Sequence, residues 1–156
     1  MAKYVVPFTT GASCAFEKKD CSVRALSNAM HISYEEAHAK IHSIGRKQGK
    51  PVNTGDLSKF YREAGLQMQI VGTTKLADYF RRIHRDVEAI EGRTVENMVK
   101  QLQTGRHIVH IKGHVFAVVD GKIHDKGMMK AGTRVVAVYS VPSERSVPMP
   151  QALPTN

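Results

Sequence analysis

The sequence predicts an α+β domain in which a helical part comes first and an antiparallel β-sheet follows. Apolar residues recur at helical spacing in several segments between positions 21 and 105. From position 107 the spacing changes to a period of two, which is typical of strands. Asp120-Gly121, between two such strands, is a strong signal for a two-residue β-hairpin turn. This order of elements predicts one domain over residues 1–141.

Helix start and stop signals divide the first two thirds of the chain. Asp20 stands where the N-cap of a helix beginning at Cys21 belongs, and Ser33 with Glu36 forms a capping box for the next helix. Thr94 caps a later helix, which Gly105 closes. The expected helices cover residues 21–31, 33–44, 56–64, 75–85 and 95–102.

The strands are expected at residues 3–8, 66–71, 107–112, 114–119, 122–125 and 134–141. For residues 86–92 the pattern fits either a strand or a loop. The segment 142–156 carries four of the six prolines, which predicts a Pro-rich tail that is extended or disordered.

Composition narrows the class of protein. The chain has 156 residues, of which 42% are hydrophobic, and no apolar run approaches the roughly 20 residues that cross a bilayer. The apolar stretch at the start of the sequence is too short for a signal peptide. Two cysteines, Cys14 and Cys21, fit a reducing compartment, and a disulfide between them would close only a small loop. We therefore expect a cytoplasmic protein, or one packaged from a cytoplasm.

Charge and histidine spacing suggest two binding functions. The formal net charge of +9 permits binding to nucleic acid, but the basic residues are scattered, which favours a solvated basic surface. His38 and His42 lie at the i, i+4 spacing of a metal pair, yet no third ligand is near in sequence. We expect this pair to face solvent, and the sequence implies no metal and no cofactor.

A cysteine-nucleophile site is the strongest chemical hypothesis. Cys21 is expected in the first turn of a helix, where free N–H groups and the helix dipole favour a thiolate. If the Asp120-Gly121 turn fixes the hairpin register, His114 and Asp125 share one sheet face as diagonal neighbours, about 7–8 Å apart. Cys14 is a rival thiol, but no helix begins behind it.

The same register ranks the other candidates for the site. Asp120 has the parity of His114 but sits in the turn, roughly 20 Å away along the strand. His124 falls on the opposite face from His114, which makes it a poor second base. The roles would then be Cys21 as nucleophile, His114 as general base and Asp125 as the carboxylate that orients the imidazole.

These residues resemble a known family. The Cys-opened helix, the Gly113-His114-Val115 strand start, the Asp120-Gly121 turn and Asp125 are similar to a papain-like cysteine peptidase, with small bacterial and phage members of the C39 type closest in layout. The segment from Asp20 to Ala25 also resembles short tailed-phage proteins. The resemblance covers about residues 10–140 and implies a papain-like fold, with the Cys-bearing helix packed on the C-terminal antiparallel sheet. It implies the same Cys21, His114 and Asp125 roles.

One feature of that family is absent. Papain-like enzymes usually carry a glutamine about six residues before the cysteine, where this chain has Ala15. Losing one oxyanion donor can cost about 10²–10³ in rate. The Cys21, His114 and Asp125 arrangement still makes a cysteine hydrolase the leading function. By the resemblance, it would be encoded by a phage and act on a peptide or protein substrate.

Two alternatives remain beside the hydrolase. An inactive papain-like structural or host-interaction protein of a virion would explain the absent glutamine and could bind phage or host proteins through its tail. A basic nucleic-acid-binding protein is the second alternative, and its affinity would fall steeply with salt.

Overall fold

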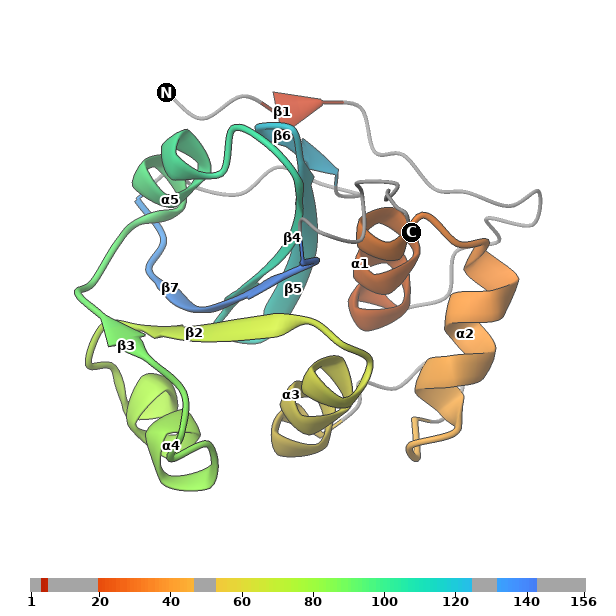
Figure 1. Cartoon of the computed structure of the whole chain (residues 1–156), viewed down its shortest axis with the longest axis horizontal. Helices are drawn as coiled ribbons and strands as arrows, with labels where there is room; N and C mark the ends of the chain where they lie inside the picture. The colour runs from red at the N-terminus through yellow and green to blue at the C-terminus, as the bar shows by residue number, and fades with distance from the viewer. Residues whose placement is uncertain (1–3, 6–19, 47–52, 125–131, 143–156) are drawn as a thin grey trace, which may run out of the picture.

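The structure, a computed structural model, describes residues 4–5, 20–46, 53–124 and 132–142. Over these ranges the chain is α+β, as the sequence predicts (Figure 1). The helices are α1 (Cys21–Met30), α2 (Tyr34–His42), α3 (Thr54–Glu63), α4 (Lys75–Ile83) and α5 (Val95–Gln101). The strands are β1 (Tyr4–Val5), β2 (Gln67–Val71), β3 (Ala89–Ile90), β4 (Arg106–Ile111), β5 (His114–Val119), β6 (Lys122–His124) and β7 (Val135–Ser140).

The sheet is mixed, which corrects the expectation of an antiparallel one. Its strand order is β1-β6-β5-β4-β7-β2-β3. Neighbours from β6 to β2 run antiparallel, but β1 pairs parallel with β6 and β3 pairs parallel with β2. The sheet is not confined to the C-terminal part either, because β2 and β3 come from the middle of the chain. The two-residue edge strands β1 and β3 are defined by their hydrogen bonds to the neighbouring strands β6 and β2.

The two faces of the sheet bury different cores. Alternate residues of the strands, such as Val115 and Ala117 in β5, pack with apolar side chains of α1, α2, α3 and α4. The residues between them, such as Phe116 and Val118, pack with α5. Figure 1 shows α1 alongside β5, with α5 on the other side of the sheet. The Cys-bearing helix α1 packs on β5 and β4 of this sheet, and the papain-like form of the packing stays a prediction.

Local capping fixes where most helices start. Ser33, Asn53, Thr74 and Thr94 each accept a hydrogen bond from a backbone N–H of the following first turn. Asp20 is different, because its side chain makes no such bond although it precedes α1. Asp20 occupies the expected N-cap position, but its carboxylate binds the side chains of Arg24 and Tyr34 and not the backbone of the first turn.

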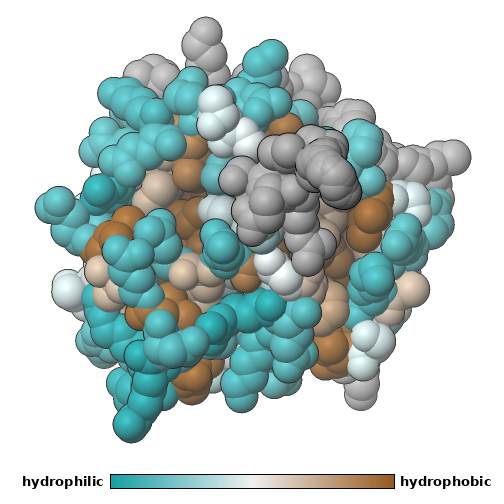
Figure 2. Space-filling model, viewed as in Figure 1, coloured by the Kyte–Doolittle hydropathy of each residue, from teal (hydrophilic) through white to brown (hydrophobic). Residues whose placement is uncertain are grey.

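One face of the molecule is largely polar over the described residues. Figure 2 shows hydrophilic side chains over most of the face it presents, with smaller hydrophobic areas between them. None of the helices in the described ranges is long and apolar enough to cross a membrane. The Pro-rich segment 143–156 lies outside the described residues.

Candidate active site

The hairpin that carries His114 has the predicted register. Val119 pairs with Lys122, Val118 with Ile123 and Ala117 with His124. Asp120 and Gly121 have φ values of 50° and 81°, as the two central residues of a type I′ turn require. The pairing of Phe116 with Asp125 falls outside the described residues, so the place of Asp125 beside His114 stays a prediction.

Cys21 and His114 come together in the structure. Cys21 is the first residue of α1 and is partly exposed, and its thiol makes a hydrogen bond with the imidazole of His114. By strand alternation His114 belongs to the face of Phe116, with which its ring stacks at 6.1 Å between centroids. Because α1 packs on the opposite face, the two side chains meet at the start of β5, around the end of the sheet. Cys14, the rival thiol, lies outside the described residues.

The surroundings of Cys21 favour its thiolate. Burial is the largest influence on the pKa of the thiol and raises it. The hydrogen bond and the positive charge of His114 act in the other direction, as do the backbone N–H of Val115 and the charge of Arg24. Together they hold the pKa of Cys21 below its ordinary value. A thiol in this position is more nucleophilic at neutral pH than an ordinary cysteine.

His124 lies on the face opposite His114, as the register predicted, since it pairs with Ala117. Helix α1, which carries Cys21, packs on that same face. The sheet face alone therefore does not exclude His124 as the base for Cys21. The hydrogen bond to Cys21 is what selects His114 as the base. Asp120 is held elsewhere, because its Oδ1 accepts from the Gly105 N–H at 2.9 Å and thereby closes the hairpin end.

A buried polar cluster behind the thiol went unpredicted from the sequence. The Tyr61 hydroxyl donates to the backbone carbonyl of Ser22 at 3.2 Å, and its ring meets Tyr139 edge-on at 4.9 Å. The Tyr139 hydroxyl lies 3.1 Å from Nδ1 of His110, which is buried on β4. Burial, with the charge of His114, lowers the pKa of His110 to about 3. A neutral histidine therefore stands behind the candidate base.

The signals for this cluster in the sequence were weak. His110 shares strand parity with Ile108, so period two alone could place it in the core. Nothing local distinguishes Tyr61, whose buried side chain contacts Ser22 of α1 and Tyr139 of β7, both distant in sequence.

The histidine pair of α2 is not arranged as a metal site. The rings of His38 and His42 stack at 3.9 Å between centroids. Nε2 of His42 lies 2.6 Å from Nη1 of Arg46, and a guanidinium can only donate. That ring nitrogen is thus engaged as an acceptor. Within the described ranges, no group of three or more His, Cys, Asp or Glu side chains is placed to hold a metal ion.

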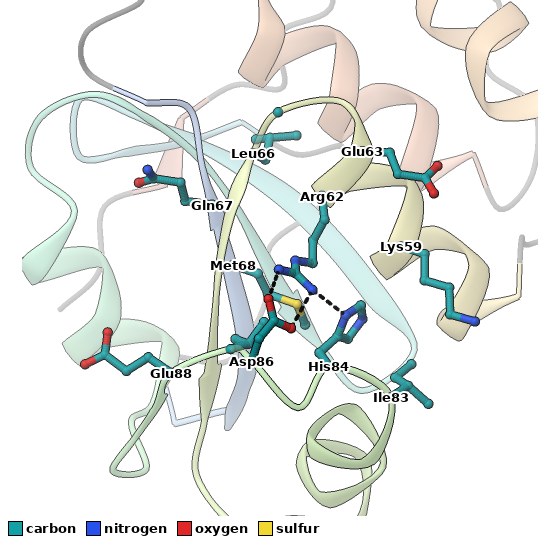
Figure 3. Close-up of a pocket in the computed structure, with 12 residues that line it drawn as sticks. Lys59, Arg62, Glu63, Leu66, Gln67, Met68, Ile83, His84, Asp86 and Glu88 are labelled. Atoms are coloured by element: carbon teal, nitrogen blue, oxygen red, sulfur yellow. Dashed lines mark hydrogen bonds and ion pairs between the residues drawn. The ribbon is translucent and has the colours of Figure 1, made fainter.

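A pocket of about 580 Å³ opens between the ends of α3 and α4, and neither Cys21 nor His114 lines it. Figure 3 shows Arg62, Asp86 and His84 turned toward one another in it. Arg62 donates to both oxygens of Asp86, at 3.1 and 2.7 Å, and Nη1 lies 3.2 Å from Nδ1 of His84.

The proton positions in this pocket exclude a serine nucleophile. Because Arg62 only donates, Nδ1 of His84 accepts and Nε2 carries the proton. Nε2 therefore donates to Oγ of Ser58 at 2.8 Å, and that hydroxyl donates in turn to the carbonyl of Gly55 at 2.8 Å. Because His84 is the donor in this hydrogen bond, it cannot accept the hydroxyl proton of Ser58. The hydrogen bond therefore has a structural role and joins α3 to the end of α4.

Comparisons of the chain with protein-family models, with curated proteins and with solved structures find no match, so the description of the site stands on its geometry.

Proposed function

We propose that the protein is a cysteine hydrolase that cleaves a peptide, isopeptide or related amide bond. Cys21 is the nucleophile and His114 the general base. The observation that carries the proposal is the hydrogen bond between thiol and imidazole at the first turn of a helix. By its sequence resemblance, the enzyme is a small papain-like peptidase of phage type that works in the host cytoplasm or in a virion.

The reaction has two steps with a thioester between them. His114 takes the thiol proton, the sulfur attacks the substrate carbonyl carbon, and the imidazolium gives its proton to the leaving amine. The same imidazole then deprotonates a water, which attacks the thioester, releases the carboxylate product and restores the thiol. The backbone N–H at the start of α1 would donate to the oxyanion. Asp125 would hold the imidazole in the required tautomer.

Acylation by p-nitrophenyl acetate tests this function. In a Cys14→Ser background we expect a burst of nitrophenol and the mass of one acetyl group on Cys21. Cys21→Ala should abolish both, and His114→Ala should slow acylation by about 10²–10⁴-fold, since general-base catalysis contributes that much. His107→Ala is the matched control, because His107 is a strand histidine bound to Ser140 and Thr104. It should acylate at the parent rate.

Peptide cleavage is measured on the same variants. A mixture of linear and isopeptide-linked peptides, read by mass spectrometry, should yield fragments only when Cys21 and His114 are both present. Acylation that is unchanged in His114→Ala, or a Cys21 that reacts like an ordinary cysteine, would contradict the proposal. Either result would favour the inactive papain-like module.

A further inference from the structure

An ion pair is buried directly beside the candidate nucleophile. Asp20 is 0% exposed and Arg24 is 6% exposed. Nε of Arg24 donates to Oδ1 of Asp20 at 2.8 Å, and the hydroxyl of Tyr34 donates to Oδ2 at 2.9 Å. Tyr34 is the first residue of α2, so the carboxylate joins the start of α1 to the neighbouring helix.

The pair directs the arginine charge toward Cys21. Side chains of a helix lean toward its N-terminus, and residues three apart lie on one face. Arg24 stands three residues after Cys21, and its bond to Asp20 draws the guanidinium back to the first turn of α1. The carboxylate of Asp20 compensates the buried charge of the arginine, which would otherwise be costly in a protein interior.

The charge of an arginine differs from that of the candidate base. His114 alternates between neutral and charged as it moves protons, whereas a guanidinium keeps its charge over the whole working range of pH. The positive charge of Arg24 also acts to lower the pKa of the Cys21 thiol. A thiolate that has just lost its proton to His114 thus stays next to a constant positive charge.

We propose that Arg24 is a positioning residue for this site. Asp20 and Tyr34 hold its guanidinium at the first turn of α1, where its permanent charge stabilises the Cys21 thiolate. The inference rests on the proposed function, but it concerns the enzyme before substrate binds. It can therefore be tested without a substrate.

The test is the pH dependence of Cys21 alkylation by iodoacetamide in the Cys14→Ser background, followed by mass spectrometry. Arg24→Met removes the charge and keeps the length, and we expect it to raise the midpoint of the reactivity profile. Arg24→Lys retains the charge and should stay near the parent midpoint. Arg81→Met is the matched control, because Arg81 pairs with Asp78 on the surface of α4. It should leave the profile unchanged.

Tyr34→Phe keeps both charges and removes one donor to Asp20, so it should move the midpoint upward by less than Arg24→Met. A folded Arg24→Met variant with the parent midpoint would overturn the inference. If Arg24→Met does not fold, Tyr34→Phe decides, and an unchanged midpoint there overturns it. A shifted midpoint in a protein that acylates but cuts no peptide would uphold the role of Arg24 and remove the proposed function.

Discussion

Three histidines of this chain differ in chemical role because they differ in their surroundings. His114 meets a thiol at the end of the sheet, and His110 is buried one strand away against the hydroxyl of Tyr139. His84 is fixed as an acceptor at Nδ1 by Arg62. Among these three, only the histidine beside the thiol is partly exposed, as the proposed general base needs to be.

The hydroxyl of Tyr139 is predicted to stabilise the fold behind the site. Tyr139→Phe leaves Nδ1 of buried His110 without that partner, which should lower the free energy of unfolding by about 1–3 kcal/mol. Urea unfolding followed by circular dichroism measures the change. Tyr79→Phe is the control, because Tyr79 is only half-buried on α4, and we expect a change within about 0.5 kcal/mol. Equal losses in the two variants would contradict a specific role for this hydroxyl.

At the scale of elements, the β5–β6 hairpin sets the place of the candidate base. Its turn needs two left-handed residues, and Asp120-Gly121 supplies them. The Asp120 carboxylate and backbone N–H both bind Gly105, which ties the hairpin to the end of α5. His114 is then carried at the far end of β5, next to the start of α1.

Gly121 is predicted to stabilise the turn that fixes this register. Its φ is +81°, and a Cβ built there would lie 2.8 Å from Oε1 of Gln103. Gly121→Ala should therefore destabilise the fold by about 1–2 kcal/mol. Gly132→Ala is the control, because a Cβ there meets nothing within 4 Å. Thermal unfolding of the two variants would contradict the prediction if both melted at the parent temperature.

For the whole molecule, buried neutral histidines predict sensitivity to acid. His110 has a pKa of about 3 in the folded state, well below the ordinary 6.5. Between these values the unfolded chain binds a proton that the folded chain does not. Stability is therefore lost as the pH falls below about 6.5, by about 1.4 kcal/mol for each pH unit, or about 2 kcal/mol at pH 5. Burial also lowers the pKa of His84, which adds in the same direction.

Urea unfolding at several pH values measures this loss. His110→Gln should have a shallower dependence of stability on pH than the parent, even if it is less stable at neutral pH. A parent-like slope in His110→Gln would show that this histidine does not carry the effect. The comparison of slopes also separates His110 from the carboxylates, which titrate in both proteins.

The helices were predictable because their signals are local. The capping residues Ser33 and Thr94 lie within one turn of the boundary they set. The strand expected at residues 3–8 contains β1, whereas the pattern over 86–92 fitted a strand or a loop, since the two-residue strand β3 exists only through its parallel partner β2. The end of α2 was placed two residues late, at 44 instead of His42, because fraying depends on neighbouring packing.

The sequence by itself determined most of the helix starts, the hairpin register and the parity of His114, because each depends on residues close together in the chain. The start of α3 is an exception, since it begins at Thr54 behind the cap Asn53, two residues before the expected position 56. Only the tertiary structure decided that the thiol of Cys21 meets His114, since that contact needs α1 to pack on β5. It also decided the role of Asp20. A residue placed to cap a helix instead holds Arg24 and Tyr34, because α2 folds back against α1 and buries the carboxylate where it needs charged and hydroxyl partners.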